Sequence, residues 1–294
     1  MRHTSTAVLA AMASLALFSP TSHAAEREVA SYALDTDVTV FTDLRTRGLS
    51  DSLMRPAAKL GLQLAHESGL VAIVEVVNVS KKQFLNGRGI DVTIGGGYRF
   101  GDPEAWHFGV GLAAELFPGA RFEAPHGFDM ADFTPTGVRS TSYNSRFALF
   151  EFGYGNVEGR LLDVISKTYR GADTGGVCGS LLQFSADPTP AFECYARGDH
   201  NSRGSLLFDL TYKTDIAPAT TLTLHAGRQR VANFSEANFN DYRVGLTRKQ
   251  WGFEWNADWV MTRNKVRELY LAIDGNKVRA TDKDKLMLSV TRRF

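Results

Sequence analysis

The residues of this sequence that could do chemistry are charged side chains spaced two apart along segments of alternating polarity. Asp209 and Lys213, for example, occupy polar positions between Leu206, Leu210 and other large apolar residues. Successive side chains of a β-strand point to opposite faces, so this spacing puts the charges on one face. If the apolar face meets lipid, the charged face lines a water-filled lumen, where charge selects among solutes.

Ten charged residues are candidates for such a pore lining. They are Lys59, Asp91, Arg99, Glu115, Glu151, Asp209, Lys213, Arg243, Glu254 and Asp258. Both signs occur, which predicts transverse fields across the lumen and not an anion-only or a cation-only pore. The alternative is that the charges pair across a narrow or plugged lumen, because a barrel of fewer strands is much narrower than a sixteen-stranded porin.

Catalytic and metal-binding patterns are missing from the sequence. There is no Gly-x-Ser-x-Gly motif, and no serine adjacent to His225 suggests a nucleophile and its base. No pattern has metal-ligand spacing. We therefore predict no catalytic residue, no metal and no cofactor, although some twelve-stranded outer-membrane barrels, such as outer-membrane phospholipase A, are enzymes.

The N-terminus predicts export. Arg2 and His3 precede an apolar stretch, and a Ser-His-Ala sequence ending at Ala24 supplies small residues for cleavage, as in a secretory signal peptide. A buried first helix is the alternative. The predicted organisation is a signal peptide at 1–24, a short periplasmic segment at 25–34 and an outer-membrane barrel at 35–294.

The two cysteines, Cys178 and Cys194, lie in a Gly- and Pro-containing segment, 171–201, that has no regular period. An exported protein meets an oxidising environment, so a disulfide that staples this loop is the favoured interpretation. A metal or reactive thiol site is the rival, with His200 as a weak partner.

Twelve segments with a period of two follow the signal peptide, each of about ten residues, which is the length that a tilted strand needs to cross a bilayer. The predicted strands are 35–46, 57–66, 70–80, 88–100, 105–117, 142–154, 157–169, 203–214, 219–231, 240–249, 251–263 and 283–294. The connections alternate between long and short. This predicts an all-β, antiparallel transmembrane barrel with short periplasmic turns, long extracellular loops and both termini in the periplasm.

Composition and residue placement agree with this class. Apolar residues make up 44% and charged residues 22%, with 33 Lys and Arg against 32 Asp and Glu, which excludes a disordered chain and a basic nucleic-acid binder. No proline falls inside a predicted strand, and aromatic residues flank the short turns. A soluble β-protein with an aromatic core is the alternative.

The last predicted strand ends at the carboxyl terminus. Leu286, Leu288, Val290 and the terminal Phe294 alternate on one face, as is common in bacterial outer-membrane proteins, whose assembly machinery reads that strand. These four residues are therefore the candidate membrane-assembly signal.

Several segments resemble the TorF family of putative porins. The segment Asp43 to Ser50 (D-L-R-T-R-G-L-S) resembles the family's opening motif, with Leu44 and Thr46 where the family has Tyr and Phe. Further similar segments are Ala65-His66-Glu67-Ser68-Gly69, Asn78-Val79, Ile90-Asp91 leading to Gly97-Tyr98, and Ser202-Arg203-Gly204-Ser205. The resemblance implies an outer-membrane barrel of the porin type in a Gram-negative bacterium.

The predicted function is passive diffusion of small hydrophilic solutes or ions through the outer membrane. The expected partners are outer-membrane lipid, the barrel-assembly machinery and the solutes, with no nucleic acid. The alternative is a non-conducting barrel with a structural or surface-binding role through its extracellular loops. A wide lumen favours the porin, and a filled, charge-paired lumen favours the alternative. Loops 118–141 and 170–202 are candidates for an inward constriction or for a cover over the outer mouth.

Overall fold

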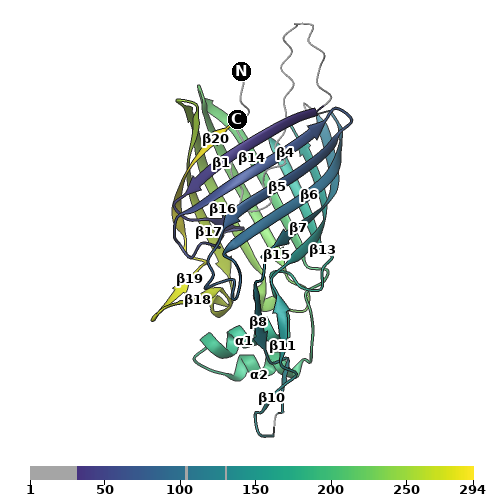
Figure 1. Ribbon diagram of the computed structural model, residues 1–294, viewed down its shortest axis with the longest axis vertical. Helices are drawn as coiled ribbons and strands as arrows, with labels where there is room; N and C mark the ends of the chain where they lie inside the picture. Colours follow the sequence, from purple (N-terminus) through teal and green to yellow (C-terminus); the bar gives the residue numbers. More distant parts are fainter. Residues whose placement is uncertain (1–31, 103–104, 130) are drawn as a thin grey trace.

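A closed antiparallel barrel of twelve strands dominates the computed structural model, which describes residues 32–102, 105–129 and 131–294 (Figure 1). Its strands are β1 (Tyr32–Phe41), β4 (Ala57–His66), β5 (Leu70–Asn78), β6 (Ile90–Gly101), β7 (Trp106–Leu116), β12 (Ser145–Tyr154), β13 (Val157–Val164), β14 (Leu206–Ala217), β15 (Thr220–Arg230), β16 (Phe239–Gln250), β17 (Phe253–Asn264) and β20 (Lys285–Arg293). The barrel closes where β1 pairs with both β4 and β20. The predicted fold class is confirmed.

The two ends of the barrel differ in the length of their connections, as the sequence predicts. Short turns join the strands at the end where β1 begins and β20 finishes, and long loops emerge at the other end (Figure 1). The long loops contain β2 (Arg45–Thr46), β3 (Leu49–Ser50), β8 (Arg121–Ala124), β9 (Gly127–Phe128), β10 (Pro135–Thr136), β11 (Arg139–Ser142), α1 (Thr174–Phe184), α2 (Thr189–Ala196), η1 (Ser235–Ala237), η2 (Arg267–Tyr270), β18 (Leu271–Asp274) and β19 (Lys277–Ala280).

The period of two along each strand separates an apolar outer face from a polar inner face. On β4, Leu60, Leu62 and Leu64 point outward and are exposed, whereas Lys59 and Gln63 at the alternate positions are buried inside the barrel. The other strands repeat this alternation, so the large apolar side chains form an outer band and not an aromatic core. No helix in the described part of the chain is long and apolar enough to cross a membrane.

Only β4 has the predicted boundaries at both ends, and the largest differences, five residues each, are at the ends of β1 and β13. β1 runs over Tyr32–Phe41, so it begins before residue 35 and ends before residue 46, because the chain after Phe41 turns into the barrel. β13 ends at Val164 and not at residue 169. The predicted signal peptide lies outside the described residues.

The cysteine-containing loop is a small helical lobe, which corrects the expectation of a segment without regular structure. The Cys178–Cys194 disulfide forms as predicted and joins α1 to α2. Both cysteines are buried in an apolar cluster that also contains Val177, Leu181 and Tyr195. The two short helices have no clear apolar period in their sequence. Tertiary packing and the disulfide hold them together instead.

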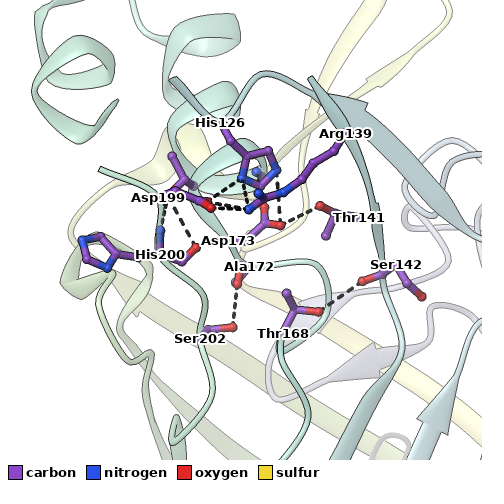
Figure 2. A network of polar contacts seen from close by, with 12 residues as sticks. His126, Arg139, Thr141, Ser142, Thr168, Ala172, Asp173, Asp199, His200 and Ser202 are labelled. Carbon is purple, nitrogen blue, oxygen red and sulfur yellow. Dashed lines mark hydrogen bonds and ion pairs between the residues drawn. The ribbon is translucent and has the colours of Figure 1, made fainter. Parts of the chain in front are cut away.

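A polar network attaches this lobe to the β8–β11 arm (Figure 2). Asp173 accepts hydrogen bonds from the Gly176 backbone N–H, capping α1, and from Thr141 Oγ1 at 2.6 Å. Arg139 Nη2 donates to both carboxylate oxygens of Asp199 at 2.6 Å, and His126 Nδ1 lies 2.8 Å from Asp199 Oδ1. The arm and the lobe therefore form one unit at the loop end of the barrel.

Candidate functional site

A hairpin made by β2 and β3, residues 43–51, enters the barrel from the loop end. Asp43 organises its base, because Oδ1 accepts hydrogen bonds from the Ser50 and Ser52 hydroxyls and Oδ2 pairs with Arg45 Nε at 2.9 Å. Gly48 turns the chain with a φ of +82°, in the left-handed region that favours glycine. The motif that resembles the TorF opening is therefore an inward hairpin.

Arg47, at the tip of this hairpin, crosses the lumen to the opposite wall. The hairpin emerges between β1 and β4, and β14 lies halfway around the barrel from them. Arg47 Nη1 lies 2.7 Å and 2.8 Å from the two carboxylate oxygens of Asp209 on β14, and Nη2 donates to the Phe208 and Arg228 carbonyls at 3.1 Å. Burial lowers the pKa of Arg47, but Asp209 and Asp241 outweigh it and raise the pKa.

A second arginine, Arg170, enters the same mouth from the loop after β13. Its guanidinium lies 2.6 Å from Asp51 Oδ2 on the hairpin and 2.9 Å from Glu115 Oε1 on β7. It also lies over the rings of Phe84 and Phe117. Burial lowers the pKa of Arg170, but Asp51 and Glu115 hold it well above its usual value. Arg47 and Arg170 thus tie the hairpin to different sides of the barrel.

All ten predicted pore-lining residues lie on the inner face of the barrel, and most have partners of opposite charge. The pairs are Lys59 with Asp37 and Glu75, Arg99 with Glu151, Lys213 with Glu158, Arg243 with Asp258, Glu254 with Arg293, Glu115 with Arg170, and Asp209 with Arg47 and Arg160. Asp91 is buried near Glu115. The mixed signs of the sequence therefore form local ion pairs along the wall.

Sequence reasoning missed two kinds of residue. The wall partners Asp37, Glu75 and Arg160 have the same parity as the predicted residues, so alternation alone could have found them. Arg47 and Arg170 lie outside the strands, and no periodic signal marks them. The segment that enters the barrel is 43–51, whereas loops 118–141 and 170–202 mainly build the arm and the lobe outside the mouth.

The four residues of the predicted assembly signal lie at and beyond the last strand. Leu286 and Leu288 are exposed on the outer face of β20, Val290 is half-buried, and Phe294 is exposed beyond the end of β20. Among the described residues, no group of three or more His, Cys, Asp and Glu could hold a metal ion.

Comparison with solved structures finds similar barrels at low sequence identity. The KdgM porin is 8% identical, with a TM-score of 0.45, over 88% of this chain and 99% of that chain. The COG4313 outer membrane channel from Pseudomonas putida F1 is 12% identical, with a TM-score of 0.39, over 89% of this chain and 95% of that chain. These structural neighbours are outer-membrane porins or channels, and the likeness concerns the barrel architecture.

Comparison by sequence gives one family. No curated protein matches the chain. The resemblance to TorF is not confirmed by a match and stays a prediction. Residues 25–294 match the family described as "Bacterial protein of unknown function (Gcw_chp)", and the chain belongs to this family.

Proposed function

We propose that this protein is an outer-membrane channel for passive diffusion of small hydrophilic solutes or ions, with hairpin 43–51 as its constriction. The apolar outer band supports a location in the outer membrane of a Gram-negative bacterium, surrounded by lipid, after removal of the signal peptide near Ala24. In this proposal the barrel-assembly machinery recognises the C-terminal strand through Leu286, Leu288, Val290 and Phe294. The charged inner face supports a hydrated lumen.

The observation that carries the proposal is the polar attachment of the hairpin tip. Leu44, at the hairpin base, is 2% exposed and packs in an apolar cluster with Phe41 and Val77. The tip instead contacts Asp209, Asp241 and backbone carbonyls. Water can replace such contacts far better than it replaces apolar packing, so the tip can leave while the base stays.

The stability of the barrel does not require charged residues on its inner face. Replacing buried ion pairs with packed apolar residues is often neutral or stabilising by about 1–4 kcal/mol. A barrel that only had to be filled would gain from apolar inner faces, and this one keeps charged residues there. The retained charge supports a lumen through which polar solutes move.

The test is single-channel recording of the purified barrel in planar bilayers, with wild type compared with Arg47→Gln. We expect discrete steps in the wild type and longer or larger openings in R47Q, because the tip loses its contact with Asp209. Loss of the arginine leaves Asp209 and Asp241 facing the lumen, so the reversal potential in a salt gradient shifts toward cation selectivity. Arg230→Gln removes the same charge from the outer face of β15 and serves as the control.

The alternative is a non-conducting barrel whose loops have a structural or surface-binding role. Two observations favour it: the lumen is charge-paired, and the disulfide-linked lobe projects from the mouth (Figure 1). A folded, heat-modifiable barrel that gives no steps at any voltage, both as wild type and as R47Q, would overturn the channel in favour of this second function.

A further inference from the structure

A large cavity lies on the loop side of hairpin 43–51, between the hairpin and the arm and lobe outside the mouth. Its volume is about 1010 Å³, and its lining includes Thr46 and Leu49 of the hairpin, together with residues of α1 and β18. A volume of this order is typical of a site for a small organic molecule. Neither proposed function needs such a cavity in front of the hairpin.

The wall of this cavity is rich in aromatic and aliphatic side chains. Six of its rings are Phe84, Phe122, Tyr143, Tyr169, Tyr195 and Tyr270. Leu182 from α1 and Leu271 from β18 add aliphatic surface. Inorganic ions and small polyols gain little from such a wall, whereas a molecule with an apolar body loses contact with water there and is stabilised.

The charged residues at the cavity are mostly basic. Lys81, Lys82 and Arg170 line it, against a single acidic lining residue among those described, Glu123. Arg170 is already paired with two carboxylates of the barrel mouth, Asp51 and Glu115. The positive charge near a ligand is therefore that of Lys81 and of Lys82, which itself pairs with Asp274.

The carboxylate opposite Lys82 is shared among several cations. Asp274 at the end of β18 lies 2.6 Å from Lys82 Nζ, 2.8 Å from Arg55 Nη2 and 2.7 Å from Arg279 Nε. These hydrogen bonds hold the pKa of Asp274 below its usual range. Three cations on one carboxylate leave a local excess of positive charge, and the three basic side chains are between 37% and 57% exposed. An incoming anion can bind there without displacing Asp274.

We propose that this cavity binds a small amphipathic organic anion, with its apolar body among the aromatic rings and its carboxylate at Lys81 and Lys82. The apolar wall selects against inorganic and strongly hydrophilic anions, and the lysines select against neutral molecules of the same shape. Binding is an equilibrium property of the mouth and is independent of whether the barrel conducts.

The test is calorimetric titration of the purified protein in lipid nanodiscs, with empty nanodiscs as the blank for partitioning. The probes are phenylpropionate, its neutral amide, and acetate as an anion without an apolar body. We expect saturable binding of phenylpropionate. The amide and acetate should bind about tenfold more weakly or worse, because the amide lacks the negative charge and acetate lacks the apolar body. Added salt weakens phenylpropionate binding.

Two variants locate the site. Lys81→Gln combined with Lys82→Gln should weaken phenylpropionate binding about tenfold, whereas Lys167→Gln, an exposed lysine outside the lining, should leave it unchanged. Gly179→Phe should weaken binding, because the added ring takes up part of the space next to Tyr195. Gly179 lines the cavity, and a Cβ there would meet the Tyr195 hydroxyl at an ordinary 3.6 Å.

The proposal is overturned if phenylpropionate does not saturate, if the amide binds equally well, or if Gly179→Phe leaves binding intact in a folded barrel. Because the assay needs no current, a barrel that binds the anion without conducting would overturn only the proposed channel. A barrel that conducts without binding would overturn only this inference.

Discussion

The tip of hairpin 43–51 and the helical lobe lie at the same mouth of the barrel, but different kinds of contact hold them in place. The tip of hairpin 43–51 lies inside the barrel and is held by ion pairs from Arg47 and by hydrogen bonds to backbone carbonyls. The helical lobe lies outside and is held by the Cys178–Cys194 disulfide and an apolar cluster around it. Polar contacts can be exchanged for water, whereas a disulfide and apolar packing cannot. We infer that the hairpin tip can move independently while the lobe stays rigid.

The hairpin and the outer loops also have different tasks. The lobe and the β8–β11 arm form walls of the cavity outside the hairpin, and the hairpin forms part of its boundary toward the lumen. A rigid outer wall keeps a binding site in shape, whereas a hairpin with a polar tip can open the path behind it. Four substitutions or conditions test this division.

The largest effect is expected from Arg170→Met, because Arg170 joins the hairpin to the barrel wall. The substitution leaves Asp51 and Glu115 buried without their cation, which costs about 3–5 kcal/mol of the free energy of unfolding. Urea unfolding measures the loss. Adding Glu115→Gln should recover part of it, and Arg121→Met at an exposed site is the control. Equal stability of the wild type and R170M would contradict the role of this arginine.

Removal of the disulfide should loosen the lobe and leave the hairpin in place. Cys178 and Cys194 are 16 residues apart, and closing a loop of that length is worth about 3 kcal/mol. In C178S/C194S we expect faster amide exchange across α1 and α2, with exchange in residues 45–50 unchanged. Chemical reduction of the wild type should reproduce the pattern. Equal loosening of both regions would mean that lobe and hairpin form a single unit.

Gly48→Ala should loosen the hairpin and leave the lobe in place. A Cβ at Gly48 would overlap Thr262 Oγ1 and approach Asp241 Cβ at 2.9 Å, and the φ of +82° adds strain, so we expect about 1–3 kcal/mol less stability for the inserted tip. Amide exchange measures the opening of residues 45–50. Gly204→Ala is the matched control, because its φ is +80° and nothing lies within 4 Å of its Cβ. If both variants change the amide exchange of residues 45–50 equally, the clash of the Gly48 Cβ with the barrel wall does not affect the stability of the inserted tip.

Acid should have the smallest effect, at the attachment of the arm to the lobe. Burial raises the pKa of Asp199, but hydrogen bonds from Arg139 and His126 outweigh it and lower the pKa below the usual value of about 3.9. Asp199 therefore stabilises the fold above that usual value, and the contribution is lost as the pH falls through the lowered pKa. Its side chain is 44% exposed, so the effect is below about 1 kcal/mol.

Urea unfolding of wild type and Asp199→Asn between pH 6 and pH 2 measures this contribution. The difference between the two proteins should be present at pH 6 and vanish toward pH 2. A difference that stays constant over this range would show that the charge of Asp199 does not hold the arm.

Local patterns predicted most of the barrel, and the reason is physical. Alternation with a period of two and the sorting of loop lengths are properties of short segments, and they located β4 at its observed bounds and the other strands to within a few residues. The same alternation placed Asp209 and Lys213 on the inner face. The predicted signal peptide and the chemistry of Cys178 and Cys194 predicted the disulfide without any structure.

The position of hairpin 43–51 required tertiary structure. Arg47 and Asp209 are 162 residues apart in the sequence, and they meet because barrel closure puts β14 opposite the point where the hairpin enters. By sequence alone, Asp43 to Thr46 continues the alternation of β1, and nothing local indicates that the chain turns inward after Phe41. The sequence by itself determined which residues lie on the outer face of the barrel and which lie on the inner face, because strand geometry alone sorts them. Only the closed barrel decided which charges pair and which segment lies across the lumen, because those contacts exist only after the first and last strands meet.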